Sequence, residues 1–432
     1  MNLTSLYSLY QSHAVICTDT RKLTDGCLYF ALKGENFNGN VFAEKAIQQG
    51  AAFAIIDEAQ FKINDRYILV EDVLKSLQNL ANFHRKQLNI PVIAIVGSNG
   101  KTTTKELISS VLSTKYNILS TPGNFNNHIG VPLTLLMLNQ KHEIAVIEMG
   151  ANHIGENELL CHIALPSHGL ITNNGKDHLE GFGSLQGVEK SNNELYVHLT
   201  HNNGIAFVNA NDGDLMRMAE TVNKKETYAA NHGLLLTSAT YKGFAQQLQP
   251  QIIFKVENHP LHNIQSNLSG DYNFDNIMAA VAIGFHFGLN LKEVMTGIES
   301  YQPKNLRSQL IEKEHNKIFL DAYNANPSSM EASIRNFAAM PGENKVLILG
   351  DMYELGSFEA AEHQAIANYC VTFELPRVIL VGTAFGKTNT GFKKFNDTAS
   401  LTVFLQNEPL INQFIFIKGS RGMKLESLLE WM

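Results

Sequence analysis

Residues 92–106 read Val92-Ile93-Ala94-Ile95-Val96-Gly97-Ser98-Asn99-Gly100-Lys101-Thr102-Thr103-Thr104-Lys105-Glu106, and this stretch decides the fold. An apolar, β-branched run stops at Gly97, a short polar loop follows, and apolar residues then recur at helical spacing. This order predicts a strand, a loop and a helix. Backbone N–H groups of such a loop, together with the helix N-terminus, can hold phosphates. The pattern predicts nucleotide binding by Gly97, Ser98, Asn99, Gly100, Lys101, Thr102 and Thr103, with Lys101 on the terminal phosphates and the Thr102 hydroxyl on magnesium.

The loop departs from the usual P-loop at one position. The usual motif has a glycine five residues before the Gly-Lys pair, where this chain has Ile95. A plain glycine turn between a strand and a helix is the competing interpretation. Packing alone gives little reason for Gly-Lys-Thr-Thr directly after a buried strand, so we expect the chain to use ATP or GTP.

The composition describes an ordinary globular chain of 432 residues, long enough for roughly two to four domains. The formal net charge of −7 and the lack of a basic run argue against nucleic acid as a partner. The four cysteines show no C-x-x-C spacing, which indicates neither a zinc site nor a disulfide framework. The first residues lack the pattern of a signal peptide, and no apolar run approaches a membrane span. We therefore expect a cytoplasmic protein without a membrane partner.

Strand and helix patterns alternate along the chain, which predicts an α/β fold whose central sheet is mostly parallel and covered on both faces. Pro91 and Pro303 interrupt the pattern. They divide the chain into a small N-terminal α/β domain (1–87), a central P-loop domain (88–303) and a C-terminal domain (304–432). Strands are expected at 144–148, 169–172, 205–209, 318–322, 346–349, 378–381 and 414–417, and a final helix at 424–431.

Two residues at strand ends could carry chemistry. Glu148 ends a predicted strand, and ligands of open α/β sheets bind beyond the carboxyl ends of strands. An acid one strand away from a P-loop is placed like the carboxylate that holds magnesium in P-loop enzymes. A solvated acid is the simpler interpretation. His178 also follows a predicted strand, but a lone histidine is more often structural than a ligand.

Three segments are rich in asparagine. Residues 121–132 contain Asn124, Asn126 and Asn127, whose neutral amides could hold a sugar or a phosphate without added charge. A turn-rich connector would have the same composition. The other two segments, 270–276 and 321–330, precede predicted helices.

The amides of these last two segments suit the edges of adenine. They are Asn273, Asn276 and Asn324, and Asp321 suits a ribose hydroxyl, although helix capping explains part of the pattern. Arg307 could neutralise a phosphate in transfer, or lie on the surface.

Seven motifs in order resemble those of the Mur ligases, the ATP-dependent amide-forming enzymes of peptidoglycan precursor synthesis. They lie at 97–106, 123–134, 148–152, 178–184 (His-Leu-Glu-Gly-Phe-Gly-Ser), 321–330 (Asp-Ala-Tyr-Asn-Ala-Asn-Pro-Ser-Ser-Met), 349–356 (Leu-Gly-Asp-Met-Tyr-Glu-Leu-Gly) and 418–423 (Lys-Gly-Ser-Arg-Gly-Met). The resemblance covers essentially the whole chain, and the short P-loop is itself typical of the family. Within the family, the motifs are most like those of the members that add D-alanyl-D-alanine.

The resemblance implies three domains: the first binds the UDP part of a substrate, the second binds ATP, and the third, Rossmann-like, closes over the site. It also implies a reaction in which D-alanyl-D-alanine is joined to UDP-N-acetylmuramoyl-tripeptide through an acyl phosphate. The implied cofactors are ATP and Mg²⁺, the implied partners are these small molecules, and we expect a monomer.

The resemblance further implies roles for individual residues. The catalytic residues are Lys101, His178 and Arg307, and the magnesium ligands are Thr102, Glu148 and His178. Beyond the P-loop, the nucleotide contacts are Asn273, Asn276, Arg307, Asp321 and Asn324. The substrate contacts are Asp19, Thr20 and Lys33 on the uridine side, together with Asn124, Asn126, Asn127, Lys418, Ser420 and Arg421.

One position departs from the family. Mur ligases carry a lysine fourteen residues after this histidine, carbamylated so that it acts as a carboxylate for a second metal ion, and here that position is Asn192. Lys190 cannot simply replace it, because residues two apart do not share a helix face. Three outcomes stay open: a weakened second metal site, a site rearranged around Asp177 or Glu194, or lost activity.

Two other interpretations compete with an active ligase of this type. A ligase of the Mur or folylpolyglutamate type with a different amino acid substrate is one, and the Asn-Ala-Asn-Pro motif at 324–327 argues against it. The other is a catalytically weakened or inactive relative that binds nucleotide or UDP-sugar, which only Asn192 favours.

Overall fold

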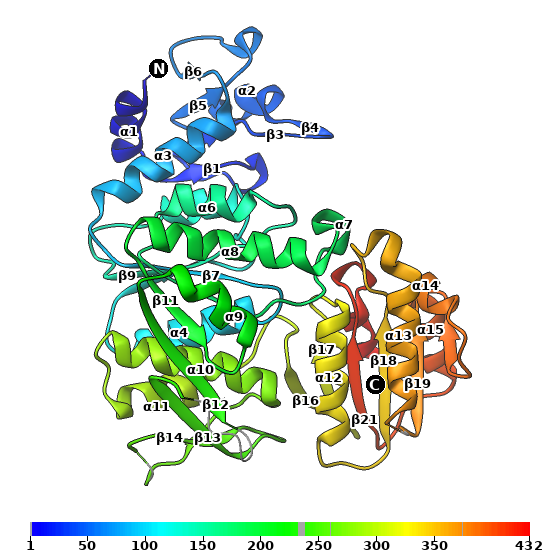
Figure 1. The fold of residues 1–432 in the computed structure, drawn as a ribbon. Coiled ribbons are helices and arrows are strands. Elements are labelled where there is room, and N and C mark those ends of the chain that lie inside the picture. The colour runs from blue at the N-terminus through cyan, green and yellow to red at the C-terminus, as the bar shows by residue number, and fades with distance from the viewer. Residues whose placement is uncertain (1, 232–237, 260, 374) are drawn as a thin grey trace.

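The computed structural model describes residues 2–231, 238–259, 261–373 and 375–432, which form three larger β-sheets with their helices and one two-stranded sheet. The N-terminal part lies at one end of a larger central part, and the C-terminal part lies at its side (Figure 1). Each sheet falls within one of the three ranges predicted from the sequence. The α/β prediction is confirmed, whereas the domain limits themselves stay a prediction.

The N-terminal part is a small parallel sheet of order β1-β2-β5-β6, with a two-stranded hairpin, β3–β4, beside it. Its elements are α1 (Leu3–Ser12), β1 (Ile16–Cys17), β2 (Leu28–Phe30), β3 (Lys33–Gly34), β4 (Phe37–Asn38), α2 (Ala43–Gln48), β5 (Phe53–Ile56), β6 (Tyr67–Leu69) and α3 (Val73–Gln87).

Helix α3 joins this part to the central one. It starts where the Asp72 side chain caps the Lys75 N–H, and it packs against α1 as well as α5 and α6. Near its end the buried Arg85 guanidinium donates to the carbonyl oxygens of Ala164 (3.1 Å), Leu88 (2.6 Å) and Ile90 (3.0 Å). The two parts therefore share one continuous core.

The central part holds a nine-stranded sheet of order β15-β14-β13-β12-β11-β10-β7-β9-β8. Strands β7 to β13 pair in parallel with their neighbours, and β14 and β15 are added antiparallel at one edge. The strands are β7 (Val92–Val96), β8 (Ile118–Ser120), β9 (Ile144–Glu148), β10 (His168–Ile171), β11 (Ile205–Asn209), β12 (Lys224–Asn231), β13 (Tyr241–Gln247), β14 (Ile253–Val256) and β15 (Ile264–Gln265). The helices are α4 (Lys101–Leu112), α5 (Gly130–Leu135), α6 (Glu156–Ala164), α7 (Leu179–Phe182), α8 (Leu185–His201), α9 (Gly213–Met218), α10 (Asp271–His286) and α11 (Leu291–Ser300).

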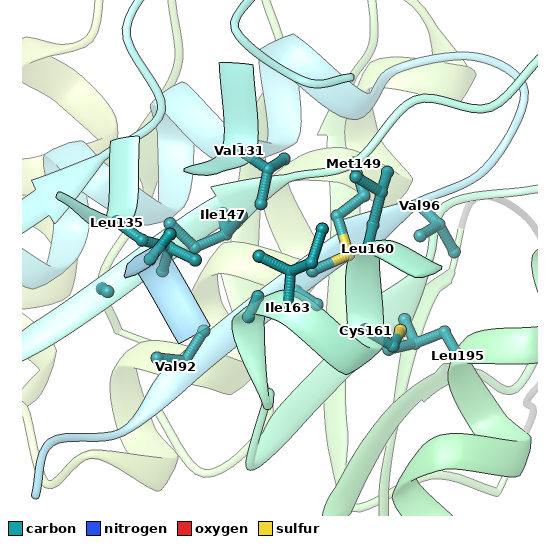
Figure 2. Packing of buried hydrophobic residues seen from close by; sticks show 14 of the residues in the cluster. Val92, Val96, Val131, Leu135, Ile147, Met149, Leu160, Cys161, Ile163 and Leu195 are labelled. Atoms are coloured by element: carbon teal, nitrogen blue, oxygen red, sulfur yellow. The ribbon is translucent and has the colours of Figure 1, made fainter. Parts of the chain in front are cut away.

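Strand β7 shows why this sheet is covered on both faces. Successive side chains of a strand point to opposite faces, and all five residues of β7 are buried. Val92, Ala94 and Val96 pack with the helices on one face, α5, α6 and α8, as Figure 2 shows for that cluster. Ile93 and Ile95 belong to the opposite cluster, formed with α4, α10 and α11. The continuous apolar run is therefore the pattern of a central parallel strand.

The C-terminal part has a six-stranded sheet of order β16-β17-β21-β18-β19-β20, parallel except for the hairpin β16–β17. Its strands are β16 (Gln309–Lys313), β17 (Asn316–Asp321), β18 (Lys345–Gly350), β19 (Arg377–Val381), β20 (Lys393–Phe395) and β21 (Phe414–Lys418). Its helices are α12 (Pro327–Ala339), α13 (Glu359–Val371), α14 (Thr383–Gly386) and α15 (Thr398–Asn407).

The last predicted helix was wrong in type. Residues Leu425–Trp431 form the 3₁₀ helix η7, after a second short 3₁₀ turn, η6 (Arg421–Met423), and Lys424 between them has a left-handed backbone. Lys424 ends η6 and begins η7, and the residues after it form 3₁₀ turns in place of the predicted α-helix. Among the described residues, none of the helices combines the length and the apolar character that a bilayer crossing requires.

Candidate active site

A cavity of about 570 Å³ lies between the central and C-terminal parts, and it gathers most of the predicted site residues. The predicted residues that line it are Ser98, Asn99, Gly100, Lys101, Thr102, Thr103, Asn124, Asn126, Asn127, Glu148, His178, Asn273, Asn276, Arg307, Asp321, Asn324 and Lys418. Strand ends of two different sheets therefore face the same space.

The P-loop connects β7 to α4 and is tightly packed. Gly97 has φ of 127°, and a Cβ there would come 2.2 Å from Thr172 Oγ1. Gly100 caps α4 with φ of 82°, and a Cβ there would come 2.7 Å from Asn276 Oδ1. Both positions need glycine, because other residues rarely adopt such φ values and no space is left for a side chain. Gly97 supports the loop and does not line the cavity.

Asn173, at the end of the neighbouring strand, fixes the loop from the side. Its Oδ1 accepts from the Asn99 N–H at 3.1 Å, and its backbone oxygen accepts from the Ser98 N–H at 3.0 Å. The Lys101 amine donates back to the carbonyl oxygens of Gly97 and Ser98, and lies 4.0 Å from Asp177 Oδ2. The loop thus keeps a phosphate-binding shape with its lysine folded against it.

Thr102 and Glu148 form the predicted magnesium pair. The Thr102 hydroxyl donates to Glu148 Oε1 at 3.1 Å, and Asn126 Nδ2 donates to the same oxygen at 2.9 Å. Glu148 Oε2 is buried without a hydrogen-bond partner among the described residues, and Lys105 Nζ lies 3.6 Å away. An unpartnered carboxylate oxygen beside a hydroxyl fits Mg²⁺, which binds through one or two protein oxygens and completes its shell with water and phosphate.

His178 is the N-cap of α7, and Asp177 lies between it and the P-loop lysine. Its Nδ1 lies 2.7 Å from Glu354 Oε2, and its Nε2 lies 3.7 Å from Asp177 Oδ1. Burial disfavours the imidazolium, but the hydrogen bond to Glu354 and the charge of Asp177 outweigh it, so the pKa of His178 is raised above its ordinary value. Within the residues that the structure covers, three or more His, Cys, Asp or Glu side chains nowhere converge as a metal site would require.

The asparagine that replaces the family lysine is part of a neutral pair. Asn192 is buried, and its Nδ2 donates to Asn174 Oδ1 at 2.8 Å. Of the two carboxylates considered as substitutes, Glu194 does not line the cavity and accepts from the Gly155 N–H at 2.7 Å and the Glu158 N–H at 2.9 Å, at the start of α6. Asp177 lines the cavity, and its Oδ1 lies 3.7 Å from His178 Nε2.

The residues predicted to contact the nucleoside come from α10 and from the C-terminal part. Asn276 accepts from the Thr104 hydroxyl at 3.0 Å and donates to Asn273 Oδ1 at 3.2 Å, so these amides are held by each other. The Arg307 guanidinium stacks on the Tyr323 ring at 3.9 Å, and its buried Nε has no hydrogen-bond partner in the described part of the chain. A stacked guanidinium with an open donor is suited to an anion.

Asp321 ends strand β17, and Asn324 follows it. Lys418, on the next strand, donates to Asp321 Oδ2 at 2.6 Å and to the Asn324 backbone oxygen at 3.2 Å. Burial would raise the pKa of Asp321, but the Lys418 charge and hydrogen bond lower it below its ordinary value. Asp321 is therefore an ionised acceptor at the cavity wall.

Five predicted substrate residues do not line the cavity. Asp19 is paired with Arg21 (2.8 Å) and Lys33 with Asp57 (3.1 Å), both in the N-terminal part, where Thr20 also lies. Ser420 is buried and accepts from the Tyr353 N–H at 2.9 Å, and Arg421 is paired with Glu426 at 2.7 Å. None of these five residues lines the cavity, so their predicted contacts with substrate stay a prediction.

Several residues of the site were not among the predictions. Asn326 caps α12, and its Nδ2 donates to Asn99 Oδ1 at 2.9 Å and to Asp177 Oδ1 at 3.0 Å. Glu354 contacts His178, and the buried Lys105 donates to the Thr121 backbone oxygen at 2.9 Å. All three lie within quoted motifs, but their partners are distant in sequence, so spacing alone gave no sign of their contacts.

Models of the Mur ligase family match the chain in three segments. The catalytic domain of the Mur ligase family matches residues 13–95, the Mur ligase middle domain residues 95–284, and the Mur ligase, glutamate ligase domain, residues 306–401. The UDP-N-acetylmuramoyl-tripeptide--D-alanyl-D-alanine ligases of Bacillus subtilis and Escherichia coli are each 34% identical to it, over 96% of this chain and 92% of their own.

Solved structures agree with this match. MurF from Acinetobacter baumannii superposes with a TM-score of 0.85 at 31% identity, covering 96% of this chain and 92% of that one. A MurF ligase from Thermotoga maritima in complex with ADP gives a TM-score of 0.85 at 25% identity, over 96% of both chains.

Proposed function

The chain belongs to the Mur ligase family, and we propose that it joins D-alanyl-D-alanine to the terminal carboxylate of UDP-N-acetylmuramoyl-tripeptide. It is an ATP-dependent ligase of peptidoglycan precursor synthesis. The observation that carries the proposal is the shared cavity, where the P-loop lysine, the Thr102–Glu148 pair and Arg307 face one space. The ADP complex of the Thermotoga relative supports a nucleotide in that space.

The proposed reaction has two steps. The γ-phosphoryl group passes from ATP to the tripeptide carboxylate, which gives ADP and an acyl phosphate. The dipeptide amine then attacks the carbonyl carbon and loses a proton, and phosphate leaves as the amide bond forms. Most of the catalysis is positioning and neutralisation of developing charge.

We assign roles within this reaction from position at the cavity. Lys101 would exchange its loop carbonyl partners for the terminal phosphate oxygens, and Arg307 would approach the transferring group from the C-terminal side. Thr102 and Glu148 would hold Mg²⁺, which neutralises phosphate charge when bound. His178 would supply Nε2 on the Asp177 side of the cavity.

The uridine side of the substrate would lie at the N-terminal part. Asp19, Thr20 and Lys33 would contact the UDP group only if the substrate extends from the cavity to the N-terminal part. We also propose that the protein acts as a cytoplasmic monomer, in line with its four buried free cysteines. Light scattering on the purified chain would report its oligomeric state.

Phosphate release tests the function. The purified chain is mixed with ATP, Mg²⁺, the UDP-linked tripeptide and D-alanyl-D-alanine, and the same mixture without the dipeptide serves as the blank. We expect release that depends on both substrates, and a fall of at least about 100-fold in Lys101→Met because a main phosphate donor is lost. Lys190→Met, an exposed lysine on α8, is the matched control and should keep the activity.

A catalytically weakened relative is the second candidate, and the neutral Asn192–Asn174 pair is the observation that favours it. Nucleotide binding without any substrate-dependent phosphate release would replace the ligase proposal by this one.

A further inference from the structure

His178 and Glu354 come from different parts of the molecule and meet at the seam between them. His178 belongs to the central part, whereas Glu354 lies in the loop between β18 and the 3₁₀ turn η5 (Gly356–Phe358) of the C-terminal part. Both residues have left-handed backbones, with φ of 45° for His178 and 63° for Glu354. Such values are uncommon outside glycine and persist only where the surroundings enforce them. Two such residues whose side chains contact each other indicate that the surrounding structure holds this contact in place.

The backbone around the pair is closely packed. The Glu180 N–H donates to the Glu354 carbonyl oxygen at 3.2 Å. Gly356 has φ of 52°, and a Cβ there would come 3.3 Å from the Cβ of Glu180. Helix α7 and η5 are in contact, and Figure 1 shows α7 reaching from the central part toward the C-terminal one. The seam therefore brings Glu354 to a defined place beside the imidazole.

The direction of the hydrogen bond follows from the chemistry of the two groups. Glu354 is half exposed, and a solvated glutamate carboxylate is ionised near neutrality and can only accept a hydrogen bond. The proton of the 2.7 Å contact must then sit on His178 Nδ1. In the neutral imidazole this leaves the lone pair on Nε2, the nitrogen on the Asp177 side.

We propose that Glu354 is a positioning residue for His178: the C-terminal part supplies the carboxylate that fixes the ring orientation and the Nδ1–H tautomer. A ligating histidine commonly has such a carboxylate on its second nitrogen. The catalytic consequence rests on the proposed ligase function, whereas the tautomer itself does not.

The exposure of Glu354 shows what the contact contributes. Its side chain is 53% exposed, compared with 20% for His178. Half-exposed ion pairs add little to stability because water screens them. The contact therefore acts on the orientation of His178, and it forms only when the C-terminal part is docked.

Imidazole nitrogen spectra test the tautomer. The full-length ¹⁵N-labelled chain is measured in alkaline buffer, where the ring is neutral, and His178→Gln identifies the signal. We expect the Nδ1–H pattern in the natural chain and a mixture of tautomers in Glu354→Ala and Glu354→Gln. Glu359→Gln is the matched control, because it changes an exposed glutamate five residues further along. An unchanged His178 signal in Glu354→Ala, or an equal change in Glu359→Gln, would overturn the proposal.

Kinetics give the second readout. We expect kcat of Glu354→Ala to fall about 10- to 100-fold, the range for losing a partner of this kind, with KM for the dipeptide little changed. Glu354→Asp, which keeps the carboxylate, should recover part of the loss. If Glu354→Ala only raised KM or only lowered thermal stability, with kcat unchanged, the result would contradict a positioning role. If the natural chain forms no product but its tautomer depends on Glu354, the ligase function fails and the contact stands.

Discussion

Asn192 fills the position of the family lysine with an amide that is already bonded, since its Nδ2 lies 2.8 Å from Asn174 Oδ1. Asn174 lines the cavity and Asn192 does not, so a longer side chain at 192 would extend past Asn174 toward the cavity. We predict that Asn192→Lys with added bicarbonate, which can carbamylate the amine, lowers the Mg²⁺ concentration needed for half-maximal phosphate release. Without bicarbonate the variant should gain nothing.

The neighbouring Asn193→Lys is the matched control for this prediction and should not respond to bicarbonate. If Asn192→Lys shows the same Mg²⁺ dependence as the natural chain in both buffers, the missing lysine does not limit the metal site.

Asp275 gives a prediction about pH. Burial raises its pKa to about 7 from 3.8, although a hydrogen bond from Asn209 acts the other way. Well below pH 3.8 the Asp275 carboxyl is protonated in both the folded and the unfolded chain, and its ionisation costs no folding free energy. As the pH rises from 3.8 toward 7, the unfolded chain releases this proton while the folded chain keeps it. The free energy of unfolding therefore falls over this range. Asp275→Asn should therefore stabilise the chain above pH 7, by on the order of 4 kcal/mol.

Urea unfolding at several pH values measures this effect. Asp65→Asn, an exposed aspartate in the N-terminal part, is the control and should shift the curves little at any pH. A gain for Asp275→Asn that is equally large near pH 4 and pH 8 would mean that ionisation of Asp275 is not its cause.

At the scale of elements, Asn326 serves helix α12 and the P-loop at once. Its Oδ1 accepts from the Ser329 N–H at 2.8 Å as an N-cap, while its Nδ2 donates to Asn99 and Asp177. Serine can cap a helix but lacks the second donor. We predict that Asn326→Ser keeps the unfolding free energy within a few tenths of a kcal/mol and lowers kcat, whereas Asn326→Ala also costs about 1 kcal/mol.

Denaturant unfolding and phosphate release, measured on both variants, separate the two functions of Asn326. Equal activity in Asn326→Ser and the natural chain would show that the side chain matters only as a cap.

How much the sequence could predict depends on whether a signal is local. The strand–loop–helix around Lys101 was predictable because apolar spacing, two glycines and the Lys-Thr pair all lie within fifteen residues. Glu148 was predictable because it ends a buried strand next to β7. The contacts of Asn326 with Asn99 and of Glu354 with His178 were not, because they depend on how two sheets dock. The final 3₁₀ helix was taken for an α-helix because apolar residues three or four apart fit both kinds of helix.

At the scale of the whole molecule, the docking of the C-terminal part is the feature most open to test. Lys176 Nζ, in the loop before His178, lies 2.6 Å from Glu362 Oε1 on α13, and the Glu362 side chain is 11% exposed. We predict a coupling of about 0.5–1 kcal/mol between Lys176→Ala and Glu362→Ala in a double-mutant cycle of unfolding.

The same cycle with Lys176 and the exposed Glu359 is the reference and should give no coupling. A coupling no larger than this reference would mean that the two parts do not dock in solution as described. The result bears on Glu354 as well, because its contact with His178 crosses the same seam.

The division into 1–87, 88–303 and 304–432 was predictable from two prolines and the order of strands, yet it stays a prediction until the parts are unfolded separately. The uridine-side residues show the limit of such reasoning: a motif can assign Asp19 or Lys33 to a substrate, but only the path of the bound substrate can connect them to a cavity that they do not line.

The lysines around the cavity are already matched with acids: Lys101 with Asp177, Lys105 with Glu148 and Lys418 with Asp321. Arg307 is a further cation in the wall, and much of the remaining wall is asparagine, which is neutral. Beyond Arg307 the cavity carries little net positive charge, and a bare triphosphate would bring more negative charge than this one cation compensates. The nucleotide's own counter-ions must therefore travel in with it, which makes the ion content of the surrounding solution a determinant of how tightly the nucleotide is held.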